Sequence, residues 1–252
     1  MHRRHVLALL VAATTFGMGG AIPSARAEGA PIPVFAAASL TEVFRAMGDA
    51  LQRAQGVATT FNFASSSTLV QQIQQGADAA VFAAADETTM GALVKSGHVA
   101  GAPAVFALNR LMIAVPPDNP QHVVSLEDLA KPGVQVALAA PSVPVGRYAR
   151  EAFAKAKVAV PTGASEELDV KAVLTKVTLG EVDAGVVYTT DVRAAGNRVL
   201  GIAIPDEHNV IARYPIAVLR DAKDAKAARA FVDFVSSPTG RDVLAGAGFG
   251  LP

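Results

Sequence analysis

The 252-residue chain contains no cysteine. Disulfides, thiolate metal sites and cysteine nucleophiles are therefore excluded. The same absence excludes a lipid-modified cysteine, which is a common membrane tether of exported proteins.

Long apolar runs and blocks of basic residues are also missing from the chain beyond its N-terminus. No segment there approaches the roughly 18 uninterrupted apolar residues of a membrane-spanning helix, so we expect a soluble mature chain. Without the leader described below, 19 basic and 22 acidic side chains remain, a net charge of −3. The absence of a basic block argues against a nucleic-acid partner.

The common catalytic and metal-binding motifs do not occur. No G-x-S-x-G turn surrounds a serine, and neither H-E-x-x-H nor the phosphate-binding G-x-x-x-x-G-K-[ST] is present. The histidines beyond the leader, His98, His122 and His208, are far apart in the sequence. We therefore expect neither an enzyme nor a metal centre, although the sequence leaves open an exported serine hydrolase that uses Ser66.

The N-terminus has the features of an export signal. The basic pair Arg3-Arg4 precedes an apolar run over residues 6–16, and residues 25–27 read Ala-Arg-Ala. This order is typical of a signal peptide with an A-x-A cleavage site. We predict a signal peptide over residues 1–27 that is cleaved after Ala27, and a periplasmic location. The choice between the general and the twin-arginine export route stays open.

Beyond the leader, strand-like and helix-like segments alternate. Strands are predicted at 32–37, 59–63, 79–84, 105–115, 135–139, 184–188, 199–204 and 213–219. Helices are predicted at 40–55, 69–75, 87–96, 146–157, 170–179, 225–235 and 239–247. The alternation predicts an α/β fold with mainly parallel sheets flanked by helices, whose ligands bind beyond the carboxyl ends of the strands.

Two proline-rich breaks, at residues 116–120 and 205–209, suggest how the chain is divided. A chain that leaves one lobe near the first break and returns near the second has two lobes joined by two crossings. We predict one lobe from residues 28–112 and 206–252, and a second lobe from residues 113–205.

Two similar turns each place a serine where a predicted strand gives way to a helix. Residues 35–42 read FAAASLTE and residues 63–69 read FASSSTL. A helix N-terminus offers unpaired N–H groups and a positive dipole end, which together bind anions. Ser39 and Glu42 also match the S-x-x-E capping box, so Ser39 could serve only as a helix cap. The hydroxyl run around Ser66 exceeds what one cap needs and favours ligand contact.

Three further candidates lie at other strand ends. Residues 140–146 would present N–H groups near Val145, and Asp169 is the expected N-cap of a helix that begins at Val170. Tyr188 ends an apolar strand, which would place its hydroxyl at the same edge as the serines. Ordinary helix starts and a half-buried core tyrosine are the alternative interpretations.

Four segments together resemble the periplasmic molybdate-binding proteins of ABC uptake systems: residues 34–41, 63–69, 185–188 and 214–218. The resemblance extends over essentially the whole mature chain. It implies the two-lobed periplasmic binding protein fold (type II-like), which closes on its ligand like a hinged clamp. It also implies a monomer that binds molybdate, and tungstate as well, without a cofactor and passes it to a membrane permease and its ATPase.

The resemblance further implies which residues hold the anion. Ser39 and Ser66 would donate through their hydroxyls and amides, Val145 and Val170 through backbone N–H groups, and Tyr188 through its hydroxyl. No cationic side chain and no metal ion takes part in such a site.

The sequence departs from the family pattern at three positions. Position 145 is often alanine in the family and is valine here, which a backbone donor tolerates. Ala80 and Ala84 replace an acid and a serine that the family usually carries. These two changes call into question hydrogen bonding from the segment 79–86, but not the ligand assignment.

Alternatives to molybdate uptake remain open at this point. The chain could bind sulfate or another oxyanion, or it could be a sensor subunit that serves a receptor instead of a transporter. Phosphate is disfavoured, because a protonated anion needs an acceptor that a shell of donors does not offer.

Overall fold

The structure, a computed structural model, describes residues 30–252. The predicted signal peptide and the cleavage after Ala27 lie outside the described residues. Within residues 30–252, none of the helices combines the length and the apolar character needed to cross a bilayer.

The described residues form nine strands and nine α-helices. The strands are β1 (Ile32–Ala37), β2 (Thr59–Ala64), β3 (Val81–Ala83), β4 (Ala104–Val115), β5 (Val136–Ala139), β6 (Ser165–Glu167), β7 (Ala184–Tyr188), β8 (Leu200–Ala203) and β9 (Ile211–Val218). The helices are α1 (Thr41–Gln55), α2 (Ser66–Gln74), α3 (Glu87–Lys95), α4 (Leu126–Leu129), α5 (Pro144–Ala156), α6 (Val170–Thr178), α7 (Thr189–Ala195), α8 (Ala225–Ser236) and α9 (Pro238–Gly246). Two short 3-10 turns, η1 (Ala38–Leu40) and η2 (Gly196–Arg198), complete the list.

The strand order places two similar half-sheets on either side of a central pair. The order is β2-β1-β3-β9-β4-β7-β5-β6, and β8 pairs with β4. In one half β1 is parallel to β2 and β3, and in the other β5 is parallel to β6 and β7. The central strands β4 and β9 pair antiparallel with each other and with their neighbours. The predicted parallel sheets are thus confirmed, with antiparallel strands where the halves meet.

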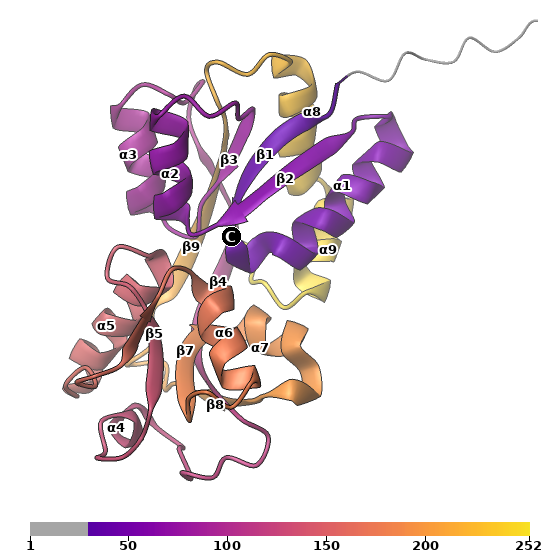
Figure 1. Cartoon of the computed structure of the whole chain (residues 1–252). Coiled ribbons are helices and arrows are strands. Elements are labelled where there is room, and N and C mark those ends of the chain that lie inside the picture. Colours follow the sequence, from indigo (N-terminus) through magenta and orange to yellow (C-terminus); the bar gives the residue numbers. More distant parts are fainter. Residues whose placement is uncertain (1–29) are drawn as a thin grey trace, which may run out of the picture.

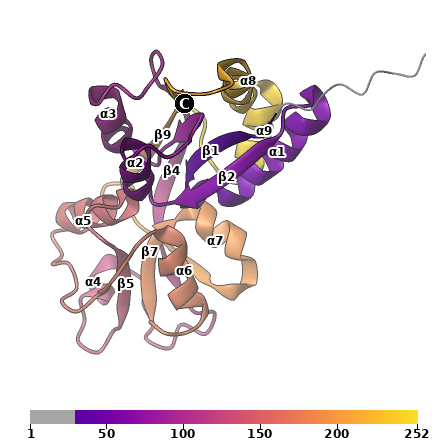
Figure 2. The same ribbon diagram turned by 45° about the horizontal axis from the view of Figure 1, so that its top comes forward.

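The two half-sheets belong to two lobes. Figure 1 shows β1–β3 with α1–α3, α8 and α9 in one lobe, and β5–β8 with α4–α7 in the other. Strands β4 and β9 run between them, and the turned view in Figure 2 shows the same division. The predicted two lobes and two crossings are confirmed, whereas the lobe limits 28–112, 113–205 and 206–252 stay a prediction.

Helix α1 illustrates how the sequence pattern becomes packing. Its apolar residues recur at helical spacing, and Phe44, Met47 and Leu51 are fully buried. The Phe44 ring lies 5.4 Å from that of Phe231 in α8, measured between ring centroids. Gly56 then ends the helix in a left-handed conformation that glycine adopts without strain.

Some predicted boundaries and elements were wrong. Helix α2 begins at Ser66 instead of residue 69, and α5 begins at Pro144 instead of residue 146. The first turn of α2 is polar and that of α5 begins with proline, so both helices start before their apolar spacing becomes visible in the sequence. Helix α4, strand β6 and helix α7 were not predicted. Strand β6 consists of three polar residues, and α7 follows β7 without a break.

One glycine allows helix α5 to start directly against the end of β5. A Cβ atom on Gly146 would lie 2.2 Å from the carbonyl oxygen of Ala140 and 2.4 Å from that of Ala139. These neighbours are backbone atoms that cannot rotate away. The close approach sets the position of the first turn of α5.

We expect Gly146→Ala to destabilise the protein by about 1–3 kcal/mol, because the added methyl group must displace backbone. Gly91→Ala in α3 is the matched control: no atom lies within 4 Å of its Cβ position. The control should be neutral or stabilise by about 0.5–1 kcal/mol. Urea unfolding of both variants measures the difference, and equal stabilities would contradict this account of the turn.

Candidate functional site

A small cavity lies between the lobes, at the carboxyl ends of strands from both half-sheets. Its lining residues are Ala37, Ala38, Ser39, Ser65, Ser66, Ala85, Val143, Pro144, Val145, Asp169, Val170 and Tyr188. They follow or end β1, β2, β3, β5, β6 and β7. All five predicted site residues are therefore brought together at one cavity.

The five predicted residues are almost completely shielded from solvent. Their exposed fractions are 5% for Ser39, 1% for Ser66, 2% for Val145, 4% for Val170 and 1% for Tyr188. Two of them lie in one lobe and three in the other. Residues of both lobes line this one cavity, so the lobes meet around it in this structure.

Helix N-termini from both lobes point at the cavity. Ser66 is the first residue of α2, Val145 the second of α5 and Val170 the first of α6. The N–H groups of a first helical turn have no acceptor within the helix. These three positions, together with the turn at Ser39, therefore offer backbone donors and positive dipole ends to one small volume.

Ser39 does not cap a helix. It lies inside the 3-10 turn η1, and the N-cap of α1 is Leu40, which has no side-chain cap bond. The Ser39 hydroxyl instead lies 3.0 Å from the hydroxyl of Tyr214 in β9. The capping-box interpretation was wrong, because the 3-10 turn moves the helix start past Ser39 and the Glu42 carboxylate bonds to Lys171.

Two serines that follow β2, Ser65 and Ser66, have different hydrogen-bond partners. The Ser65 side chain caps α2 by accepting from the N–H of Thr68 at 3.2 Å. The Ser66 hydroxyl accepts from the N–H of Ala85, which follows β3, at 2.9 Å. Ser65 thus caps the helix. The Ser66 oxygen, at the cavity, already accepts one hydrogen bond from the backbone.

Asp169 is the N-cap of α6, as predicted, and its Oδ1 accepts from the N–H of Ala172 at 3.0 Å. Among the lining residues it is the one that carries a charge. The remaining lining residues are apolar or carry hydroxyls, so the cavity presents donors and dipoles instead of cations.

Tyr188 brings a hydroxyl to the cavity from the end of β7. Within residues 30–252, this buried oxygen has no hydrogen-bond partner. Burial raises the pKa of Tyr188, so the group keeps its proton and can donate it. A buried hydroxyl without a partner is costly, and a ligand oxygen would satisfy it.

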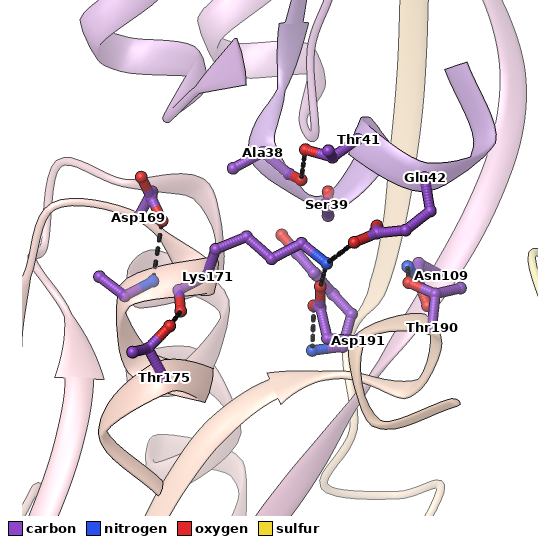
Figure 3. Close-up of polar contacts among 12 residues, drawn as sticks. Ala38, Ser39, Thr41, Glu42, Asn109, Asp169, Lys171, Thr175, Thr190 and Asp191 are labelled. Atoms are coloured by element: carbon purple, nitrogen blue, oxygen red, sulfur yellow. Dashed lines mark hydrogen bonds and ion pairs between the residues drawn. The ribbon is translucent and has the colours of Figure 1, made fainter. Parts of the chain in front are cut away.

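Cations do lie nearby, but each is paired with a carboxylate. Figure 3 shows Lys171 reaching from α6 to Glu42 at the start of α1, with Asp191 beside it. The Lys171 Nζ lies 2.9 Å from Glu42 Oε2 and 3.3 Å from Asp191 Oδ1. On α5, Arg147 pairs with the buried Asp86, which precedes α3. Both Lys171–Glu42 and Arg147–Asp86 join the two lobes.

These ion pairs were not predicted from the sequence, nor was the buried contact of Asn109 with Tyr214 behind Ser39. The positions of the two cations in the sequence did indicate that they need carboxylate partners. Arg147 and Lys171 stand in the first turns of α5 and α6, where the helix dipole disfavours positive charge. A basic residue in such a place indicates a carboxylate partner elsewhere in the fold.

The departures at Ala80 and Ala84 leave the backbone bonding of that segment in place. The N–H of Ala80 donates to Pro33 at 2.8 Å, and that of Ala84 donates to Pro215 at 2.9 Å. Both alanines are buried. Interlobe bonding from this segment comes from Asp86, two residues beyond Ala84.

Asp191 is completely buried in the wall behind Tyr188. Its Oδ2 accepts from the N–H of Tyr188 at 3.1 Å. Burial raises the pKa of Asp191 to about 6, and the ammonium group of Lys171 opposes this shift. The folded state therefore retains a proton on Asp191 at pH values where the unfolded chain has released it.

We expect the stabilising effect of this retained proton to be lost as the pH rises from about 4 to about 7. The free energy of unfolding of the wild type relative to Asp191→Asn should fall by about 1–3 kcal/mol over that range. Urea unfolding of both proteins, without added anion, at several pH values measures the difference. A difference that grows with pH would mean that the folded state prefers the ionised carboxylate.

The chain is similar to known proteins along most of its length. The sequence profile of the family described as bacterial extracellular solute-binding protein matches residues 32–250. The molybdate-binding protein ModA of Mycobacterium tuberculosis is 39% identical over 237 residues, which cover 91% of this chain and 88% of that protein. The protein of the same name in Escherichia coli is 32% identical over 249 residues, with 94% and 95% covered.

The fold is also that of a solved structure. The periplasmic molybdate-binding protein of Azotobacter vinelandii superposes with a TM-score of 0.78 at 19% identity, covering 88% of this chain and 99% of that one. At this identity the likeness establishes a shared fold.

Proposed function

The chain belongs to the family of bacterial extracellular solute-binding proteins, and from this premise we propose that it binds molybdate, and tungstate as well, for uptake by an ABC transporter. Proteins of this family bind a solute and do not convert it, so the chain is a binding protein and not an enzyme. The serine hydrolase alternative is therefore set aside. The ligand is cargo, and no cofactor is indicated.

The observation that carries the proposal is the set of donors at the cavity. Ser39, Ser66 and Tyr188 offer hydroxyls, and Val145 and Val170 offer first-turn N–H groups. No lysine or arginine of the described chain lines this cavity. A tetrahedral dianion carries only acceptors, so its chemistry matches such a lining.

The strength of such binding follows from the number of donors. A hydrogen bond to a charged group contributes about 1.5–3 kcal/mol. Five or more converging donors exceed the cost of ordering the two lobes and removing water from the anion. The same donors disfavour hydrogen phosphate, whose own proton needs an acceptor.

The two lobes contribute unequal but complementary parts. Ser39 and Ser66 come from the lobe of β1–β3, and the other three residues come from the lobe of β5–β8. An anion held by both sets would stabilise the closed arrangement. The closed protein, cleaved after Ala27 on export to the periplasm, would dock as a monomer on the permease, whose ATPase drives uptake.

Titration calorimetry with molybdate, tungstate, sulfate and phosphate tests the ligand. We expect molybdate and tungstate to bind at least about 100-fold more tightly than phosphate, because the donors offer the phosphate proton no acceptor. Tighter binding of sulfate than of molybdate would instead identify a sulfate carrier. Failure of all four anions to bind would overturn the proposed function.

Ser39→Ala and Ser66→Ala should each weaken molybdate binding by about 1–3 kcal/mol, because each removes a donor to a charged ligand. Ser67→Ala is the matched control. Ser67 bonds to Ser65 at 3.1 Å in the same turn but does not line the cavity. Calorimetry of the three variants measures the effect, and equal affinities would remove the site assignment.

The ion pairs between the lobes should support closure. Arg147→Gln would leave the Asp86 carboxylate, which is 3% exposed, without its cation in the closed form. We expect molybdate binding to weaken by about 1–2 kcal/mol and the ligand-free radius of gyration in X-ray scattering to increase.

Glu151→Gln is the control for this variant. It removes an ion pair to Lys155 on the same helix, 3.3 Å long, that does not cross between the lobes. Its affinity and radius should match those of the wild type. Equal effects of the two variants would argue against a role of the Arg147–Asp86 pair in closure.

A further inference from the structure

A series of buried hydrogen bonds leads from the crossing strands to Ser39. We propose that Asn109 and Tyr214 are positioning residues that fix the Ser39 hydroxyl as a donor toward the cavity. They thereby restrict the site to fully deprotonated tetrahedral anions. This inference rests on the oxyanion-binding function proposed above.

The orientation of the Asn109 side chain in β4 is set by the backbone of the next residue. Its Oδ1 accepts from the N–H of Arg110 at 2.9 Å, so its amide nitrogen faces the opposite way. That nitrogen donates to Thr190 Oγ1 at 2.9 Å and lies 3.5 Å from the Tyr214 hydroxyl oxygen. Figure 3 shows Asn109 and Thr190 side by side. An amide nitrogen can only donate, so the tyrosine oxygen is the acceptor.

The hydroxyl of Tyr214 in β9 lies between Asn109 and Ser39. The residue is completely buried, and its hydroxyl lies 3.0 Å from Ser39 Oγ. Either hydroxyl of the Ser39–Tyr214 pair could be the donor; because Asn109 offers a donor to the tyrosine oxygen, our proposal assigns the shared proton to Tyr214. Burial raises the pKa of Tyr214, so this proton is retained.

The Ser39 hydroxyl is therefore an acceptor on one side and a donor on the other. Within residues 30–252, Tyr214 is the hydrogen-bond partner of this oxygen, and no second one is found. Ser39 lines the cavity, and its proton is free to rotate toward it. A ligand oxygen placed there receives this proton.

Ser66 has the same arrangement by an independent route. Its Oγ accepts from the backbone N–H of Ala85 at 2.9 Å. A backbone N–H cannot accept, so the Ser66 proton also remains for the cavity. The two serines of the lobe thus receive a hydrogen bond from behind and present a donor in front.

Two hydroxyls whose protons point at the cavity favour an anion that has no proton of its own. If either hydroxyl could turn around, its lone pair would accept the proton of hydrogen phosphate or hydrogen arsenate. The carboxylate of Asp169 and the hydroxyl of Ser65 also line the cavity and can accept; Ala172 engages Asp169 Oδ1, and Thr68 engages Ser65 Oγ. Selection for a deprotonated anion therefore depends on the direction of these hydroxyls.

Tyr214→Phe isolates the hydroxyl from the packing of the ring. The Tyr214 ring contacts those of Phe106, Tyr188 and Phe249, at centroid distances of 6.4, 5.8 and 5.6 Å. Phenylalanine keeps these contacts. What the variant loses is the proton donated to Ser39.

A double-mutant cycle with molybdate calorimetry tests the inference. We expect Tyr214→Phe to raise the Kd for molybdate about 5- to 20-fold in the wild-type background. In the Ser39→Ala background the same change should alter the Kd less than about twofold, because the hydroxyl it acts on is absent. In the Ser66→Ala background, the control, it should keep its full effect.

The selectivity of the site provides a second readout that a purely structural role would not move. In Tyr214→Phe the Ser39 hydroxyl can turn and accept, so the ratio of the phosphate Kd to the molybdate Kd should fall about tenfold. Asn109→Leu removes the donor to Tyr214 and should also lower the ratio of the phosphate Kd to the molybdate Kd. It replaces Tyr214→Phe in this test if that variant does not fold.

The outcomes separate the two proposals. If the wild type binds molybdate but Tyr214→Phe has equal effects in all three backgrounds, or leaves the ratio unchanged, the positioning role is overturned while the proposed function stands. If the wild type binds none of the four anions, both are overturned.

Discussion

The removal of water from a small dianion is the constraint on which the arrangement of this molecule depends. An ion that loses its hydration must regain equivalent hydrogen bonds from the protein. Here the donors stand at the carboxyl ends of strands in two half-sheets, where first helical turns leave N–H groups unpaired. Because neither lobe holds the whole set, the complete set of donors exists only when the lobes meet.

The cationic side chains near the cavity form ion pairs and do not line it. Lys171 and Arg147 follow closely on the donor positions Val170 and Val145, yet their charges are taken up by carboxylates of the other lobe. They thereby link the lobes without entering the cavity. The site is left with oriented dipoles and hydroxyls, whose directions can distinguish anions of equal charge by their protonation.

The crossing strands connect the lobe arrangement with the site. Strands β4 and β9 run between the lobes and pair with each other from Ala104–Ile216 to Arg110–Ile211. The same two strands carry Asn109 and Tyr214, which stand behind Ser39. The side chain of Asn109 also bonds to Thr190 at the start of α7 in the second lobe. The hydrogen bonds behind Ser39 thus include groups from both lobes.

The elements with strong periodicity and the turns that line the cavity could be predicted from the amino-acid sequence. Helix α1 follows from its apolar spacing. The proposed donor positions Ser39, Ser66, Val145, Val170 and Tyr188 follow from strand ends and from the family resemblance. Short polar elements such as β6 were not predictable, because three residues carry too little pattern.

The hydrogen-bond and ion-pair partners of these groups could not be predicted, because they lie far away in the sequence. The sequence S-x-x-E at Ser39 reads the same whether the serine caps a helix or faces a ligand, and its partner Tyr214 is 175 residues away. The pairing of Lys171 with Glu42 spans 129 residues. Local patterns specify which groups a segment offers, but the direction of a hydroxyl or the partner of a charge is set by segments that meet only when the chain is folded.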